Sequence, residues 1–251
     1  MIDTDSWIRR FFPSPRAEFQ LVCLPHAGGS APFYHPVAQA LSPRVEVLAV
    51  QYPGRQDRRR EPMIGTVGEL ADRVAEAVRA TVDRPFAIFG HSLGATLGYE
   101  VGVRLEAGGL RPERLFASGR RAPSAHRDER VHLRDDAGLI AELRTLAGTD
   151  QRVFGDDELL RMVLPAIRND YRAAETYRHA GGARLRCPVV ALTGDRDPKA
   201  TLDEVAAWET HTDGGFELKT YPGGHFYLVE HAADVIRVID ERLAGPVAAR
   251  R

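Results

Sequence analysis

Cysteine is scarce in this chain of 251 residues, where only Cys23 and Cys187 occur. The two lie far apart in the sequence and in apolar contexts, V-C-L and R-C-P-V-V, so we expect no disulfide framework and a reducing cytoplasm. Lysine is equally scarce, at Lys199 and Lys219 only, and the other basic residues are arginines. We interpret that bias as codon usage and not as arginine-specific recognition.

A strong net charge and long apolar runs are lacking as well. With 34 basic and 35 acidic residues the formal net charge is −1, so no global field favours nucleic acid or an anionic membrane as a partner. No stretch approaches the roughly 18 apolar residues of a membrane span, and the acidic start M-I-D-T-D-S does not fit a secretory signal. H-E-x-x-H and clustered Cys and His ligands are absent, so we expect no metal and no cofactor.

Short apolar runs alternate with helical patterns along most of the chain. Helices are predicted at residues 93–107, 229–243 and 66–82, where Thr66 can cap the helix and Glu69 can complete a capping box. Strands are predicted at residues 20–24, 45–50, 85–89, 115–118, 189–192 and, with weaker alternation, 216–221. This alternation indicates an α/β fold with a mostly parallel sheet covered on both faces.

Residues 125–180 depart from the alternation, because they are polar and helical in character and show no strand pattern. We expect a helical lid there, inserted between two strands of a single domain over residues 1–251. Its charged stretches, R-D-E-R, R-D-D and G-D-D-E, are expected to form a solvated outer face and not a docking surface. The lack of a long apolar stripe favours a monomer.

The stretch G-H-S-L-G, which contains Ser92, lies between the predicted strand at residues 85–89 and the helix at residues 93–107. In that context G-x-S-x-G is typical of a nucleophile elbow, a sharp turn that lifts the serine hydroxyl above the sheet. Gly90 and Gly94 would remove side chains that clash in the turn. By itself the pattern is common, and its position between a strand and a helix makes Ser92 a candidate nucleophile.

A serine nucleophile needs a base and an acid, which follow it in the chain in this architecture. His225 is the favoured base because it follows the last predicted strand in the glycine loop Y-P-G-G-H-F. Four other histidines fall near the lid or inside a helix, where a surface position is expected: His126, His132, His179 and His231. The acid should follow the strand at residues 189–192, where T-G-D-R-D-P offers Asp195 and Asp197, and the pattern does not choose between them.

An oxyanion hole requires two backbone N–H groups aimed at the reacting carbonyl oxygen. The glycine-containing loop P-H-A-G-G-S follows the first predicted strand, so we assign the amides of Ala27 and Leu93. His26, in the same loop, is interpreted as organising the loop and not as a catalyst.

Seven motifs occur in order between about Trp7 and about Leu243, nearly the whole chain: L-V-C-L-P-H-A-G-G-S, Q-Y-P-G-R-Q-D-R, G-H-S-L-G-A, S-G-R-R-A-P-S, L-P-A-I-R-N-D-Y, T-G-D-R-D-P and G-G-H-F-Y-L. Together they resemble the type II thioesterases, editing hydrolases that accompany modular polyketide synthases and nonribosomal peptide synthetases. The resemblance implies an α/β-hydrolase fold with a mobile lid. It also implies hydrolysis of stalled acyl groups from the phosphopantetheine arm of acyl carrier proteins.

Carried over by motif position, the resemblance makes Ser92 the nucleophile, His225 the base and Asp197, the second aspartate of G-D-x-D, the acid. A long neutral arm needs a channel, and we expect its walls in the lid and in the loop at residues 27–36. The candidate lining residues are Phe33, Tyr34, Phe154 and Tyr171, with ordinary core packing as the alternative for each. Three other functions stay open: a general esterase or amidase, an acyltransferase, and a catalytically silent scaffold.

Overall fold

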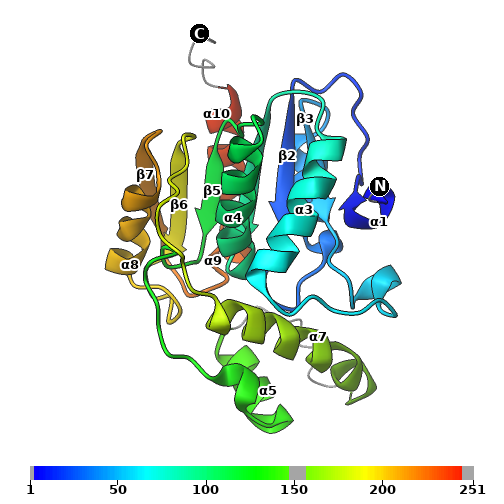
Figure 1. Ribbon diagram of the computed structural model, residues 1–251, viewed down its shortest axis with the longest axis vertical. Coiled ribbons are helices and arrows are strands. Elements are labelled where there is room, and N and C mark those ends of the chain that lie inside the picture. The colour runs from blue at the N-terminus through cyan, green and yellow to red at the C-terminus, as the bar shows by residue number, and fades with distance from the viewer. Residues whose placement is uncertain (1–2, 147–156, 245–251) are drawn as a thin grey trace.

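The structure, a computed structural model, describes residues 3–146 and 157–244 of the chain. Within these ranges the strands form one seven-stranded sheet in the order β1-β3-β2-β4-β5-β6-β7 (Figure 1). The strands are β1 (Ile8–Arg9), β2 (Phe19–Leu24), β3 (Val45–Val50), β4 (Phe86–His91), β5 (Leu115–Ser118), β6 (Val189–Gly194) and β7 (Phe216–Tyr221). Among the strands of the described residues only β1 pairs antiparallel with its neighbour, so the predicted, mostly parallel sheet is confirmed.

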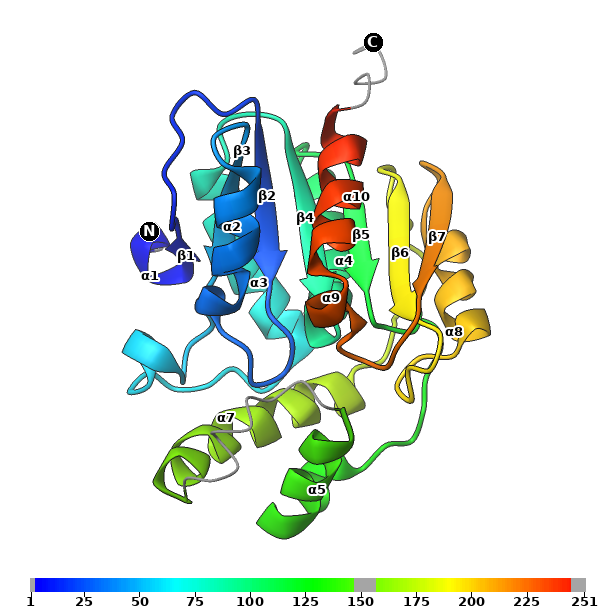
Figure 2. The same ribbon diagram turned by 180° about the vertical axis from the view of Figure 1, so that it is seen from behind.

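Helices cover both faces of the sheet. Figure 1 shows α3 (Val67–Thr81) and α4 (Leu93–Ala107) on one face, and Figure 2 shows α2 (His35–Leu41) and α10 (Ala232–Ala244) on the other. The short helices are α1 (Thr4–Trp7), α8 (Leu202–Ala206), α9 (Tyr227–Glu230) and the 3-10 turns Ala31–Tyr34, Gln56–Arg58, Val131–Leu133 and Ala207–His211. This covering on both faces is what a parallel sheet requires.

Successive residues of a strand point to opposite faces of the sheet. Both sets are apolar in the central strands, so the sheet is apolar on both sides. In β2, Val22 and Leu24 belong to the apolar cluster under α3 and α4, whereas Leu21 and Cys23 belong to the cluster under α2 and α10. All four side chains are fully buried. The central strands are therefore held from both sides, which makes their carboxyl ends a rigid base for functional loops.

Two helix predictions have different outcomes. The helix at residues 93–107 has the predicted bounds, and Thr66 caps α3 by accepting a hydrogen bond from the Glu69 amide at 3.3 Å. The final helix, predicted from about residue 229 to 243, is present as α10, but it begins at Ala232 because the short helix α9 ends at Glu230. His231 lies between the two helices, where its Nε2 contacts the Pro222 carbonyl at 2.8 Å.

The chain between β5 and β6 carries the helices α5 (Asp136–Leu146) and α7 (Asp157–Thr176). Both views show these helices lying across the carboxyl ends of the strands (Figures 1 and 2). A small apolar cluster of their own joins them: Val131, Leu139, Leu143, Leu160, Leu164 and Ile167. This is the segment in which we expect the lid.

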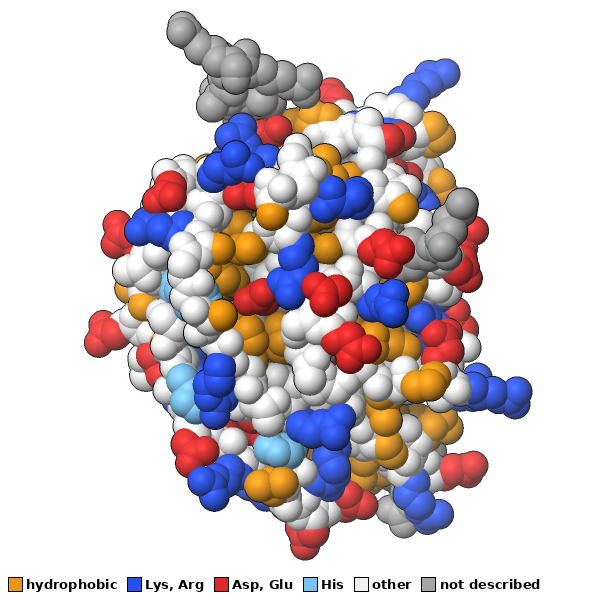
Figure 3. Space-filling model, in the orientation of Figure 1, with side chains coloured by type: hydrophobic (Ala, Val, Ile, Leu, Met, Phe, Trp, Pro, Cys, Tyr) orange, Lys and Arg blue, Asp and Glu red, His pale blue; other side chains and the backbone are white. Residues whose placement is uncertain are grey.

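The surface that bears α3 and α4 carries basic and acidic side chains interspersed, and neither sign forms a continuous field (Figure 3). That distribution agrees with the formal net charge of −1. None of the helices in the described ranges combines the length and the apolar character that crossing a membrane requires.

Candidate active site

Ser92 occupies a strained turn between β4 and α4. Its backbone angles are φ 55° and ψ −116°, in a region that non-glycine residues seldom adopt. The flanking glycines allow the turn, since a Cβ on Gly90 would lie 2.0 Å from the Gly94 carbonyl oxygen and one on Gly94 would lie 2.0 Å from that of Leu24. The predicted elbow geometry is therefore present, with the serine at the start of a helix.

His225 and Asp197 form a buried pair next to this turn. The Nδ1 of His225 lies 2.9 Å and 3.0 Å from the two carboxylate oxygens of Asp197, which place the ring N–H between them. The Asp197 carboxylate is fully buried and accepts a further hydrogen bond from the Lys199 amide at 2.8 Å. With Nδ1 held in this way, Nε2 is the nitrogen left to accept a proton.

Asp195, the other candidate acid, faces a different partner. Its Oδ1 accepts a hydrogen bond from the Gly223 amide at 2.8 Å, and its side chain is 47% exposed. The geometry thus separates two aspartates that lie two positions apart: Asp197 contacts the imidazole, and Asp195 holds the glycine loop that carries it.

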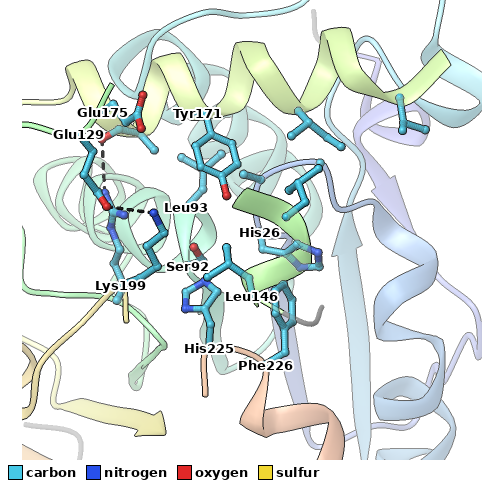
Figure 4. A pocket seen from close by; sticks show the side chains of 17 residues that line it. His26, Ser92, Leu93, Glu129, Leu146, Tyr171, Glu175, Lys199, His225 and Phe226 are labelled. Carbon is cyan, nitrogen blue, oxygen red and sulfur yellow. Dashed lines mark hydrogen bonds and ion pairs between the residues drawn. The ribbon is translucent and has the colours of Figure 1, made fainter. Parts of the chain in front are cut away.

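Ser92 and His225 share one cavity of about 170 Å³. Figure 4 shows the Ser92 side chain directly beside the His225 ring. Ala27 and Leu93 line the same cavity, and their amides have no hydrogen-bond acceptor in the described part of the chain. Leu93 is the first residue of α4, where a helix leaves its N–H groups unpaired. The sequence-predicted nucleophile, base, acid and oxyanion donors are all brought together.

Residues 19–243 match the thioesterase domain family. The chain belongs to that family. It is 53% identical over 244 residues to the thioesterase PikA5 of Streptomyces venezuelae, an alignment that covers 96% of this chain and 87% of that protein. It is 31% identical over 243 residues to the gramicidin S biosynthesis protein GrsT of Aneurinibacillus migulanus, covering 95% and 94% of the two chains.

Solved structures agree with this assignment of the thioesterase. The type II thioesterase BorB from the borrelidin biosynthetic cluster is 56% identical, with a TM-score of 0.90 and coverage of 97% of this chain and 100% of that one. YbtT, a type II thioesterase from the yersiniabactin pathway, is 30% identical with a TM-score of 0.84, covering 94% and 97%. The fold is therefore the α/β-hydrolase fold, and the protein is a thioester hydrolase.

Helices α5 and α7 form one wall of the thioesterase cavity (Figure 4). The residues they contribute to it are Leu143, Leu146, Val163, Ile167, Tyr171, Ala174 and Glu175. Of the expected channel residues, Tyr171 lines the cavity, whereas Phe154 lies outside the described residues. Phe33 and Tyr34 do not line it. The Phe33 ring packs edge-on against that of His26, with their centroids 4.8 Å apart. Tyr34 is 1% exposed, and its hydroxyl donates a hydrogen bond to the Leu24 carbonyl. For these two the alternative, core packing, holds.

The ring of His91, the residue before the nucleophile, packs against His225 and Phe226, and the sequence analysis did not single it out. His91 is fully buried, and its ring centroid lies 5.0 Å from that of His225 and 5.1 Å from that of Phe226. Burial and the neighbouring His225 lower the pKa of His91 well below its usual value, and the same causes lower the pKa of His26 to about 3. Both rings are therefore neutral at physiological pH. The position of His91 next to Ser92 was the available signal.

Charged side chains gather at the other end of the cavity, and the sequence pattern did not reveal them. Lys199 donates to Glu129 at 3.0 Å, and Arg121 donates to the same carboxylate at 2.7 Å. Burial would raise the pKa of Glu129, but these two cations outweigh it and lower the pKa to about 2. Arg120 is also buried, which lowers its pKa to about 10. The cavity thus combines an apolar lid wall with a polar end (Figure 4).

The remaining histidines near the lid lie away from Ser92. His126 is exposed, as expected. His132 is not a free surface residue, because its Nδ1 and its amide both contact the buried Glu175 carboxylate. His179 packs edge-on against His211 at a centroid distance of 4.9 Å. None of the three lines the cavity.

Proposed function

We propose that this thioesterase hydrolyses stalled or wrongly loaded acyl groups from the phosphopantetheine arm of acyl carrier proteins in a modular polyketide or nonribosomal peptide synthase. One observation carries the proposal: a strained serine lines one cavity with His225, whose Nδ1 contacts the buried Asp197 carboxylate. The names of the relatives, which place PikA5 among thioesterases and BorB among type II thioesterases, support the same class.

In the first half of the reaction, Nε2 of His225 takes the Ser92 proton as the hydroxyl oxygen attacks the thioester carbonyl. Asp197 stabilises the imidazolium that forms, because its carboxylate is fully buried and lies 2.9 Å from Nδ1. The Ala27 and Leu93 amides receive the negative charge that develops on the carbonyl oxygen. The carbon–sulfur bond then breaks, and the proton passes from His225 to the departing thiolate of the arm.

In the second half, water attacks the acyl-serine ester. His225 removes a proton from that water, the same two amides bind the new oxyanion, and the proton is returned to Ser92 as the free acid leaves. The arm is released as a thiol, ready for reloading. All of these steps use side chains and amides of this chain.

The cavity supports small acyl groups as substrates. Its volume of about 170 Å³ is modest, and the lid helices α5 and α7 supply its apolar wall. We propose that the arm enters between this lid and the body of the enzyme, and that lid movement adapts the cavity to acyl groups of different size. Two free, buried thiols, Cys23 and Cys187, support action in a reducing cytoplasm, and we propose a monomer as the acting species.

The test is the intact mass of a carrier protein loaded with acetyl, propionyl or butyryl groups after incubation with the enzyme. We expect wild type to return it to the holo form and Ser92→Ala to leave the acyl group in place, with turnover at least about 10³-fold lower. Alanine removes only the hydroxyl, so thermal unfolding should stay near that of wild type. If the carrier stays acylated while simple esters are cleaved, the enzyme is a general esterase. Transfer of the acyl group to an added alcohol or amine would make it an acyltransferase. If no reaction depends on Ser92, the protein is a catalytically silent scaffold.

A further inference from the structure

Two of the motifs in the sequence remain without a role in the chemistry above: Q-Y-P-G-R at residues 51–55 and L-P-A-I-R-N-D-Y at residues 164–171. The first follows β3, and the second lies in the lid helix α7. Both come together on a third motif, the loop P-H-A-G-G-S at residues 25–30, which holds the Ala27 amide.

A buried ion pair joins the two motifs. Arg55 and Asp170 make a bidentate contact, Nη1 to Oδ2 at 2.6 Å and Nη2 to Oδ1 at 2.9 Å. The side chains are only 8% and 2% exposed. Burial would lower the pKa of Arg55, but the charge and hydrogen bonds of Asp170 outweigh it and raise the pKa of the guanidinium above its usual value. Neither residue lines the cavity that contains Ser92.

The same pair grips the oxyanion loop at the two residues that follow Ala27. The Gly28 amide donates to Oδ2 of Asp170 at 2.8 Å, and Nη1 of Arg55 donates to the Gly29 carbonyl at 3.2 Å. Gly28 has φ +75°, and a Cβ there would lie 2.5 Å from Cγ1 of Ile167 on α7. The lid helix is thus packed directly on the loop backbone. The two hydrogen bonds hold the Ala27–Gly28 and Gly29–Ser30 peptide planes, so the backbone directly after Ala27 has little freedom to rotate.

Other residues of the first motif hold the ends of the loop. The Tyr52 hydroxyl donates to the Pro25 carbonyl at 3.1 Å, and the Ala31 amide donates to Oε1 of Gln51 at 3.0 Å. These contacts fix where the loop starts and finishes. The Arg55–Asp170 pair holds the middle of the loop, together with the loop's own hydrogen bond from the Gly29 amide to the His26 carbonyl at 2.9 Å.

We propose that Arg55 and Asp170 are positioning residues that hold the Ala27 N–H in oxyanion-binding geometry and make that geometry depend on the seating of the lid helix α7. The inference rests on the proposed role of the Ala27 amide. The oxyanion hole is then complete only while the segment of α7 around Asp170 lies against the loop. If the lid opens for acyl exchange, either another part of the lid moves or catalysis stops while this segment is displaced.

The decisive variant removes both charges. Asp170→Asn alone leaves the Arg55 guanidinium buried without an opposite charge, which can unfold a protein. The double variant Arg55→Met with Asp170→Leu keeps similar volumes and leaves no charge unpaired, so it should fold. Asn169→Ala is the matched control: the preceding residue of the same helix also ties the lid to the body, by donating to the Ile64 carbonyl at 2.7 Å, but does not contact the loop.

Two readouts separate positioning from simple stability. The first is kcat and KM for a propionyl N-acetylcysteamine thioester, and the second is the Ki of an alkyl trifluoromethyl ketone, whose adduct with Ser92 carries an oxyanion. We expect the double variant to lose about 10- to 100-fold in kcat, with KM within about threefold, and to bind the ketone correspondingly more weakly. Asn169→Ala should keep both values within about threefold of wild type.

The inference is overturned if the folded double variant keeps the wild-type kcat and Ki, or if it and Asn169→Ala lose activity equally in step with their thermal unfolding. The proposed function fails in a different way. If Ser92→Ala cleaves the thioester as fast as wild type, the nucleophile is wrong, and the oxyanion hole with it. If wild type cleaves the thioester but leaves a carrier protein loaded, only the substrate is wrong and the roles of Arg55 and Asp170 stand.

Discussion

At the scale of single residues, the site depends on which polar groups the fold turns toward one another. Asp195 and Asp197 have the same side chain, lie two positions apart and follow the same strand. Of the two, Asp197 contacts His225, and its carboxylate is fully buried. Burial in a low-dielectric setting strengthens the stabilisation that Asp197 can give to a charged imidazole.

Asparagine substitutions should separate the two aspartates. Asp197→Asn should lower kcat/KM by about 10⁴-fold, because an amide cannot stabilise the imidazolium and favours the wrong tautomer of His225. Asp195→Asn should cost less than about fivefold, since an amide oxygen can still accept from the Gly223 amide. Steady-state hydrolysis of a propionyl thioester measures both. Equal losses in the two variants would contradict the assignment of the acid.

At the scale of elements, the turn from β4 into α4 decides where the nucleophile lies. The sequence pattern predicts α4 with its observed bounds. The start is marked by the turn at Ser92 and the end by Gly108 and Gly109. The break between α9 and α10 was beyond the pattern: at His231 the backbone leaves helical angles, with φ −107° and ψ 30°, and no proline or glycine marks the position. Helix α2 was also missed, because its short apolar pattern lies within a loop-like stretch rich in proline and glycine.

Alanine at two glycines should have opposite effects on stability. Gly94→Ala would place a Cβ 2.0 Å from the Leu24 carbonyl oxygen, so the elbow must open, and we expect a loss of about 3 kcal/mol or more. Gly68→Ala, near the start of α3, meets nothing closer than 4.0 Å and should stabilise the enzyme by about 0.5 kcal/mol through helix propensity. Urea unfolding midpoints give the comparison. A tolerated Gly94→Ala would mean that the turn is not as tight as its contacts indicate.

At the scale of the whole molecule, stability should depend on pH through buried histidines. Three of them, His26, His91 and His211, have a lowered pKa, to about 3 for His26 and about 4 for His211. The unfolded chain, with histidine pKa values near 6.5, takes up protons first as the pH falls. Stability conferred by the neutral rings is therefore fully present above about pH 6.5 and is lost as the pH falls toward the lowered values.

His211 allows this linkage to be tested away from the active site. It is buried among Tyr99, His179 and Trp208, and its Nε2 lies 2.8 Å from the Ser124 hydroxyl. His211→Gln should lessen the fall of the unfolding free energy between about pH 6.5 and pH 4.5 by up to about 1 kcal/mol per pH unit. Exposed His126→Gln is the control and should leave the slope unchanged. An unaltered slope in His211→Gln would show that this ring does not contribute.

The sequence by itself determined the alternation of strands and helices, the elbow around Ser92, and the base and oxyanion positions, because each depends on neighbours within a few residues along the chain. The residue pattern left Asp195 and Asp197 open as the acid, the family resemblance chose Asp197, and the tertiary structure shows its contact with His225. Only the tertiary structure decided that Tyr34 packs in the core and that Arg55 meets Asp170. The Asp197–His225 contact joins residues 28 positions apart, and the Arg55–Asp170 contact joins residues 115 positions apart. Local periodicity carries no information on such pairs, whose geometry appears only when the strands pair and the lid helix packs on the loop.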